Sequence, residues 1–296
     1  IDWKSYNRNL VNRGQITFWF SPEIIGDWIA SPEKKRGAQK FYSDAAIEML
    51  SVIRFRYNLT LRSTQGFAES IMQLMGVEVP IPDYTTLSRR LKNISVELKG
   101  KLSKEAVHIV IDSTGLKIFG EGEWKVRQHG YSKRRDWMKL HLAIDSSNNQ
   151  IISAALTSNS FKDNQLFSDL IDEIPGEIEQ VSADGAYDSK DCYEKARERN
   201  FIPAFPPRRG SRINKHGNTS GAKNLRDENI RGVKKLGRKG WKKSINYHQR
   251  SLSETAMYRF KTILGDRMSS REFDRQANEA FIKCQVLNKM ATPKFC

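Results

Sequence analysis

The chain has 296 residues, of which 38% are hydrophobic and 10% aromatic, so it is long enough for about two domains and can bury a real core. Its formal net charge is +16 and its sequence pI about 9.7, which favours a polyanionic partner, and nucleic acid is the usual one. No apolar run approaches the roughly 18 residues of a membrane-spanning helix, and the three cysteines lack CxxC spacing, which argues against a disulfide framework and a structural zinc site.

The first hundred or so residues predict helices. FYSDAAIEMLSVIRFRY begins with an N-cap at Ser43, and TLRSTQGFAESIMQLMG gives a second helix that ends at Gly76. VEVPIPDYTTLSRRLKN gives a proline-marked turn and a short third helix, which carries Arg89, Arg90 and Lys92. This order suits a helix-turn-helix whose third helix contacts DNA, although a plain three-helix bundle with a solvated basic face fits equally well.

From about residue 106 the pattern changes to short strands. HIVID ends in Asp112, and GLKIFG follows a two-residue turn as its expected hairpin partner. The further expected elements are strands at 138–145 and 151–158, a helix near 163–173, a strand at 179–184 that ends in Asp184, a helix at 188–200 and a short strand in FIPAFPP. Hairpin strands followed by alternating helix and strand predict a mixed α/β sheet.

Residues 208–243 differ from the sheet region in composition. They contain thirteen Lys or Arg and two acidic residues, and their glycines leave little periodicity, so we expect a flexible basic insertion. A charge run is usually a solvated loop, but binding of phosphates with release of counterions explains such an excess better.

Three acidic residues frame this insertion. Asp112 and Asp184 each follow a buried-looking strand, and they converge if those strands are neighbours, because ligands bind outside the carboxyl ends of strands in open α/β sheets. Either aspartate alone is most often a turn residue. With Glu254 they offer three hard oxygen ligands of the kind that suits Mg²⁺, and two such ions can activate a nucleophile and stabilise the leaving oxygen of a phosphodiester.

The stretch NYHQRSLSETAMYRFK places Tyr247, Arg250, Glu254 and Lys261 at offsets that share one face of a helix. Leu252, Ala256, Phe260 and Ile263 lie on the opposite side, so that side is expected to face the core. A capping box at Ser251, in which Glu254 reaches back, would instead begin the helix after Arg250 and break the shared face. A solvated charged face with an ordinary i,i+4 pair is the other simple alternative.

Together these residues resemble the DDE transposases of bacterial insertion sequences. Asp112, Asp184 and Glu254 match the DDE triad in order, and the Tyr-x2-Arg-x3-Glu-x6-Lys spacing matches the motif of one large group of that family. ADGAYDS, WKVRQHGYSKRRDWMKLHLAID and QANEAFIKCQVLNKM are similar to segments of the same group. The resemblance covers about 106–296 well and the N-terminal helices loosely.

The resemblance implies domains at 1–105, helical and DNA-binding, and at 106–296, a ribonuclease-H-like mixed-sheet catalytic domain. It implies two Mg²⁺ or Mn²⁺ ions, with Asp112 bridging both, Asp184 on one and Glu254 on the other. It also implies a single helix for the Tyr–Lys motif, against the capping box. The DNA-binding residues expected are Tyr247, Arg250, Lys261, Arg89, Arg90, Lys92, Lys133, Arg134, Arg135, Arg208, Arg209, Lys234, Lys235, Arg238, Lys239 and Trp241.

The implied reaction is cleavage of a phosphodiester at a transposon end, followed by attack of the released 3′-OH on target DNA. The expected partners are double-stranded DNA, as terminal inverted repeats and target, and a second copy of the chain in a synaptic homodimer. We expect no membrane partner and a bacterial cytoplasmic, nucleoid-associated protein. A stand-alone Mg²⁺ nuclease of the same fold and a non-catalytic DNA-binding regulator are the alternatives. Trp241 could stack on a displaced base, but a lone tryptophan is more often a packing residue.

Overall fold

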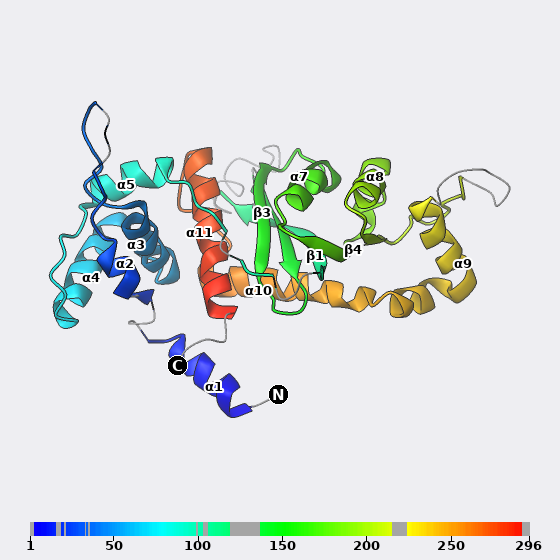
Figure 1. The fold of residues 1–296 in the computed structure, drawn as a ribbon, viewed down its shortest axis with the longest axis horizontal. Helices are drawn as coiled ribbons and strands as arrows, with labels where there is room; N and C mark the ends of the chain where they lie inside the picture. The colour runs from blue at the N-terminus through cyan, green and yellow to red at the C-terminus, as the bar shows by residue number, and fades with distance from the viewer. Residues whose placement is uncertain are drawn as a thin grey trace, which may run out of the picture. The chain divides into compact units, whose positions relative to one another are not determined.

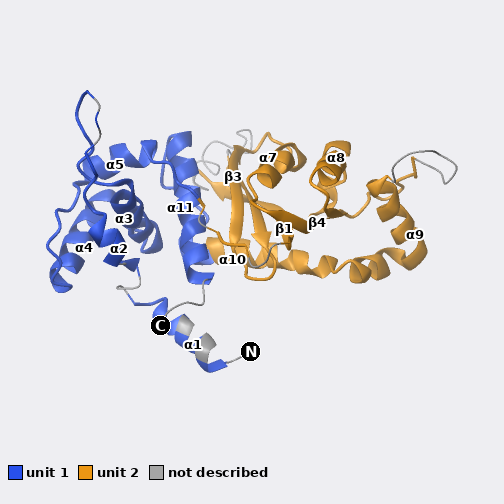
Figure 2. Ribbon diagram, viewed as in Figure 1, with its two compact units in different colours: residues 1–97, 262–296 blue, residues 98–261 orange. Residues whose placement is uncertain are grey.

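The computed structural model describes residues 3–15, 19–20, 22–32, 34, 36–98, 100–102, 106–118, 137–214 and 224–291. The chain forms two compact units, residues 1–97 with 262–296 and residues 98–261 (Figure 2). The domain limits expected from the sequence, 1–105 and 106–296, stay a prediction. None of the described helices is long and apolar enough to cross a membrane.

The first unit is built from helices (Figure 1). Those described are α1 (Trp3–Asn12), α2 (Pro22–Gly26), α3 (Asp44–Arg56), α4 (Leu61–Leu74), α5 (Tyr84–Asn93) and α11 (Phe273–Ala291). The Ser43 side chain accepts a hydrogen bond from the Ala46 amide at 3.0 Å and so caps α3, as predicted. Gly76, at φ 66°, follows the end of α4, where a left-handed residue is common after a helix.

The second unit contains a five-stranded mixed sheet of order β3-β2-β1-β4-β5, which confirms the predicted mixed α/β sheet. The strands are β1 (Ala106–Lys117), β2 (Trp137–Asp145), β3 (Ile151–Ser158), β4 (Glu177–Ser182) and β5 (Ile202–Ala204). The first three strands pair antiparallel in a meander, whereas β4 pairs parallel with β1 and β5 parallel with β4. The switch from antiparallel to parallel pairing follows from the helices that connect the later strands.

The hairpin predicted within 108–120 is wrong, because β1 is one continuous strand. Ser113 and Thr114, the expected turn, instead pair with His141 and Leu140 of β2. The long partner strand satisfies their backbone groups in a ladder, so a turn is not needed. β2 lies between two strands and is buried on both faces, with His141 as fully buried as Leu142.

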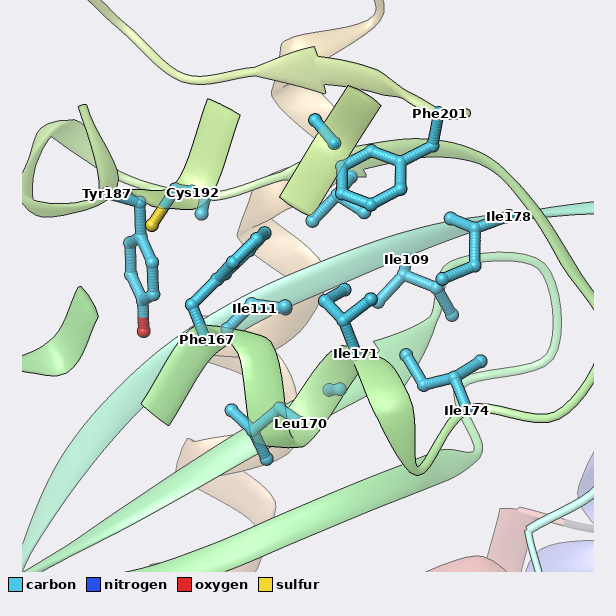
Figure 3. Close-up of a cluster of buried hydrophobic side chains, with 14 of the residues drawn as sticks. Ile109, Ile111, Phe167, Leu170, Ile171, Ile174, Ile178, Tyr187, Cys192 and Phe201 are labelled. Carbon is cyan, nitrogen blue, oxygen red and sulfur yellow. The ribbon is translucent and has the colours of Figure 1, made fainter. Parts of the chain in front are cut away.

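Helices cover one face of this sheet (Figure 1). They are η2 (Asp163–Leu166), α7 (Phe167–Asp172), η3 (Gly185–Tyr187) and α8 (Lys190–Glu198). Phe167 of α7 packs on Tyr187, Phe201 and Phe205 with ring centroids 5.5–6.3 Å apart, beside Ile109 of β1 (Figure 3). This apolar layer fixes the turn after β4, where Asp184 lies.

The basic insertion, residues 208–243, was expected to be a flexible loop, and for its residues 225–243 this is wrong. They form α9 (Leu225–Ser244), which Asn224 caps and which bends at Gly237, where φ is 69° and ψ 163°. Only glycine adopts that conformation readily, so the bend is built into the sequence. η4 (Tyr247–Arg250) and α10 (Ser251–Leu264) follow α9.

Candidate functional site

Strand register brings the first two acidic residues to the same edge of the sheet. Val110 of β1 pairs with Ser182 of the parallel strand β4. Asp112 and Asp184 each lie two residues beyond that pair. Asp112 lies within β1, and Asp184 directly follows β4 as the N-cap of η3, so the two aspartates occupy equivalent positions along neighbouring strands. The condition for the two aspartates to converge, that their strands are neighbours, is therefore met, although β1 continues past Asp112.

Arg250 joins the first acidic residue to the third. Its Nη1 donates to Asp112 Oδ2 at 2.8 Å, and its Nη2 donates to Glu254 Oε1. The buried Ser253 hydroxyl also donates to Asp112 Oδ2, at 3.1 Å. One guanidinium thus holds carboxylates that are far apart in the sequence, in the planar, forked geometry that arginine favours.

The stretch from Tyr247 to Lys261 is not the single helix that the resemblance implies, and its α-helix begins after Arg250, as the capping-box alternative expected. Tyr247–Arg250 forms the 3-10 turn η4, which leads directly into α10 at Ser251. Ser251 has helical φ and ψ, and its hydroxyl donates to the His248 carbonyl at 2.9 Å, so the predicted capping box is wrong. The tighter turn moves Tyr247 off the exposed face and into the interior, at 7% exposure. Of the expected core side, Ala256 and Phe260 are buried.

The negative charges of all three acidic residues influence the pKa of Tyr247. Burial raises the pKa of Tyr247 to about 12, and the charges of Asp184, Asp112 and Glu254 add to the rise, whereas Arg250 opposes it. Burial also raises the pKa of Asp112, and the charge of Asp184 adds to it against the Ser113 amide and Arg250. These shared effects indicate that the carboxylates surround one region.

A second tyrosine borders the same region. Tyr187 is 1% exposed, and within the described residues its hydroxyl has no hydrogen-bond partner. Burial raises the pKa of Tyr187 well above its ordinary value, and the charges of Asp163, Asp112 and Asp184 add to the rise. The acidic edge of the sheet therefore lies beside a buried donor that the other described groups leave unused.

The three acidic residues suit a divalent cation by the chemistry of their oxygens. Mg²⁺ and Mn²⁺ prefer carboxylate oxygen, and Arg250 already places positive charge between Asp112 and Glu254. In the described parts of the chain, however, no three His, Cys, Asp or Glu side chains are arranged as a finished metal site. The donor set fits the ion, and the side chains would have to close around it.

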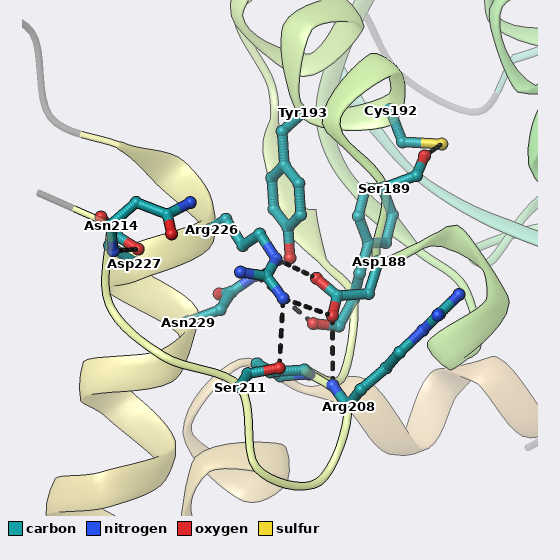
Figure 4. Close-up of polar contacts among 12 residues, drawn as sticks. Asp188, Ser189, Cys192, Tyr193, Arg208, Ser211, Asn214, Arg226, Asp227 and Asn229 are labelled. Carbon is teal, nitrogen blue, oxygen red and sulfur yellow. Dashed lines mark hydrogen bonds and ion pairs between the residues drawn. The ribbon is translucent and has the colours of Figure 1, made fainter.

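A further carboxylate, Asp188, lies in ADGAYDS, and sequence reasoning assigns it no role. It is fully buried and accepts hydrogen bonds from Arg226 Nε at 2.8 Å, Arg226 Nη2 at 3.1 Å and the Arg208 amide at 3.1 Å (Figure 4). The Arg226 guanidinium also donates to Ser211 Oγ at 3.1 Å. The signal in the sequence was an acidic residue directly after an apolar motif, since a buried charge needs a partner.

The remaining predicted basic residues have different surroundings. Lys133, Arg134 and Arg135 lie outside the described residues. Arg208, Arg209, Lys234, Lys235, Arg238 and Lys239 are exposed. Trp241 is 3% exposed, with its ring 6.1 Å from that of Tyr247, so it packs and the base-stacking alternative is not supported.

In the first unit, the basic residues of α5 are divided between internal contacts and the surface. Arg90 donates to the Tyr42 carbonyl at 2.8 Å and pairs with Asp44, and Lys92 pairs with Glu272 at 2.9 Å. Arg89 lines a hollow of about 540 Å³ together with Arg62 and Tyr84, where α4 and α5 begin. Arg89 is thus better placed for a ligand than Arg90.

Comparison with known proteins gives two family models, both described as a transposase DDE domain, which match residues 11–121 and 103–289. A piggyBac transposase synaptic complex with hairpin DNA is similar with a TM-score of 0.42 and 10% identity, over 95% of this chain and 74% of that one. A Drosophila P element transposase strand transfer complex is similar with a TM-score of 0.30 and 11% identity, over 56% of this chain and 38% of that one. Both scores are too low to add to the family matches.

Proposed function

The chain belongs to the DDE transposase family, whose model spans residues 103–289, and from this premise we propose that Asp112, Asp184 and Glu254 are its catalytic acids. The observation that carries the proposal is the Arg250 guanidinium, which joins Asp112 to Glu254 at the sheet edge that Asp184 shares. The acids are 72 and 70 residues apart in the sequence, so it is the fold that brings Asp112 and Glu254 to the same guanidinium.

The proposed cofactor is a pair of divalent cations, Mg²⁺ or Mn²⁺, held by these three carboxylates. Such ions supply an activated water and stabilise the charge that develops on the oxygens of a phosphodiester. Asp112 is well suited to hold a cation, because burial already raises its pKa and positive charge beside it relieves that cost. No histidine or serine base is needed in this scheme.

The side chains around the acids would bind and orient the DNA. Arg250, whose guanidinium pairs with Asp112 and Glu254, is of the type that binds a phosphate through a forked pair of hydrogen bonds, and Lys261, two turns beyond Glu254 on α10, adds a point charge. The buried ring of Tyr247 leaves only its hydroxyl for a phosphate contact. The exposed lysines of α9 extend the positive surface, and each phosphate that they neutralise releases counterions.

The wider arrangement is proposed from the same premise. We propose that the five-stranded sheet is a ribonuclease-H-like core, supported by its antiparallel meander followed by two parallel strands. The helices α3, α4 and α5 are proposed to bind the transposon ends in a helix-turn-helix manner, supported by Arg62 and Arg89 beside their hollow. Two transposon ends must be held together for joining, which favours a homodimer on DNA.

Glu254→Gln tests the assignment, because it keeps the size of the side chain and removes the charge. The substrate is a plasmid that carries the ends of the element that encodes this chain, with Mg²⁺ present. We expect strand cleavage to be abolished and binding of the end duplex to be retained. Cleavage by this variant at the wild-type rate would contradict the proposal. Glu194→Gln, an exposed change on α8, is the matched control and should cleave normally.

The products distinguish a transposase reaction from simple hydrolysis. The wild-type protein should give cut ends and, with target plasmid added, DNA in which the 3′ ends are joined to the target. A nuclease of the same fold would give cut ends alone, and a DNA-binding regulator would give neither.

A further inference from the structure

Asp188 links parts of the second unit that are distant in sequence. Its carboxylate accepts from Arg226, 38 residues away, and from the Arg208 amide, 20 residues away. Asp188 directly follows η3, the turn that begins at Asp184. A carboxylate that is fully buried and holds three N–H donors cannot move without leaving charged groups unpaired. The turn after Asp184 is therefore attached to the first turn of α9.

Further contacts continue this attachment along α9. Asn229 Nδ2 donates to the Pro203 carbonyl of β5 at 2.8 Å. Beyond the bend at Gly237, Arg238 Nη2 donates to the Pro207 carbonyl at 2.8 Å. Both carbonyls belong to the segment that leads from β5 to the Arg208 amide. α9 is thus fixed to β5 before its bend and to the segment that follows β5 after it.

The far end of α9 is attached to the other candidate residues. Trp241 packs against Gly232 so closely that a Cβ at Gly232 would lie 2.6 Å from the Trp241 Cδ1 atom. The Trp241 ring packs against that of Tyr247, three residues before Arg250. Gln180 of β4 donates to the Ile245 carbonyl at 2.8 Å and ties this end to the sheet as well. α9 therefore spans from the Asp184 turn to the Arg250 turn.

Between these attachments α9 carries exposed positive charge. Lys234, Lys235 and Lys239 are exposed, and no carboxylate within the described ranges pairs with them. We propose that Asp188 is a positioning residue which, through Arg226 and the Arg208 amide, holds the lysines of α9 in register with the three acidic residues, so that a DNA strand bound by α9 presents one particular phosphodiester for cleavage. This proposal rests on the proposed function.

The position of Asp188 excludes direct contact with DNA. Its carboxylate is fully buried and is held by Arg226 and the Arg208 amide. It acts through Arg226 on the placement of α9, and not on the reacting atoms. A pair that served stability alone would lower the amount of folded protein without changing what the folded protein does at saturating DNA.

Asp188→Asn and Arg226→Lys test the role in the full chain. The first removes the charge at constant shape, and the second keeps the charge but loses the two-bond fork, so it is the gentler change if the first does not fold. The measurements are duplex affinity against salt concentration, and the single-turnover cleavage rate at saturating DNA on an end-labelled duplex that carries the element's end. Folded protein is quantified by circular dichroism in the same buffer.

We expect duplex affinity and its salt dependence to stay within about twofold, because the lysines remain. The saturated cleavage rate per folded molecule should fall at least tenfold, and cuts should spread over neighbouring phosphodiesters. Glu228→Gln, which breaks an exposed pair with Arg231 on the same helix, should behave as wild type. An unchanged saturated rate, or a loss of rate that only follows a loss of affinity, overturns the positioning role. If the wild-type protein itself fails to cut, or Glu254→Gln cuts normally, the proposed function fails instead.

Discussion

Two aspartate–arginine pairs in the second unit have the same chemistry in different surroundings. Arg250 and Asp112 lie 2.8 Å apart, with their side chains 23% and 18% exposed. Arg226 and Asp188 also lie 2.8 Å apart, but the Asp188 side chain is 0% exposed. A partly exposed carboxylate can exchange its partner for water or another cation at low cost, whereas a buried one cannot. The Arg250–Asp112 pair is therefore suited to a site whose contacts must exchange. The Arg226–Asp188 pair is suited to a permanent structural attachment, an anchor for α9.

The largest expected difference is in stability. Asp188→Ala leaves Arg226 and the Arg208 amide without their acceptor, so it should lower the free energy of unfolding by about 3 kcal/mol. Asp112→Ala should cost less than about 1 kcal/mol, because Glu254 still pairs with Arg250 and the burial that opposes the Asp112 charge disappears. Urea unfolding followed by tryptophan fluorescence measures both. Equal losses of unfolding free energy for the two variants would show that the difference in burial does not determine how much each pair contributes to stability.

A buried pair in the helical unit extends the comparison. Glu279 is fully buried, pairs with Lys283 at 2.9 Å and accepts from the Ser269 and Ser270 amides. Burial acts to raise the pKa of Glu279, but the Lys283 charge and these hydrogen bonds outweigh it, so the pKa lies below its ordinary value of 4.5. A lowered carboxyl pKa gives stability that is present above pH 4.5 and is lost as the pH falls through the folded-state pKa.

Glu279→Gln should therefore cost about 3 kcal/mol at neutral pH, since it leaves the Lys283 ammonium without its carboxylate. The difference from wild type should shrink as the pH falls below 4.5. Urea unfolding at a series of pH values measures it, and Glu272→Gln, an exposed acid paired with Lys92, is the control with no such cost. A difference that does not change with pH would mean that the carboxylate charge is not what stabilises this unit.

A small effect on stability, like that of Asp112→Ala, is expected for Arg250→Gln. Glu254 is 59% exposed and regains water when Arg250 leaves, so the unfolding free energy should change by less than about 1 kcal/mol. Cleavage at the transposon end should nevertheless fall, because the proposed phosphate contact is lost. Single-turnover cleavage beside urea unfolding separates the two effects. A loss of unfolding free energy as large as that of Asp188→Ala would show that Arg250 has a structural role like that of Asp188.

The limits of sequence reasoning appear at particular residues. The cap at Ser43, the glycine at position 76 and the β2–β3 hairpin follow from local patterns and appear in the structure. The turn expected at Ser113 does not, because its backbone groups find partners on β2, which is distant in sequence. The basic insertion contains a helix because buried contacts of Arg226, Asn229 and Trp241 compensate for its glycines.

The sequence by itself determined the class of the protein: the order of strands and helices from β2 to β5, the order of the acids Asp112, Asp184 and Glu254, and the positive charge that favours a polyanionic partner. Those features are carried by residue type and spacing along the chain. Only the tertiary structure decided that β1 and β4 are parallel neighbours, that Arg250 joins Asp112 to Glu254, and that Asp188 is an anchor for α9. Such contacts depend on strand register and on burial, which are set by the whole fold and not by neighbours in sequence.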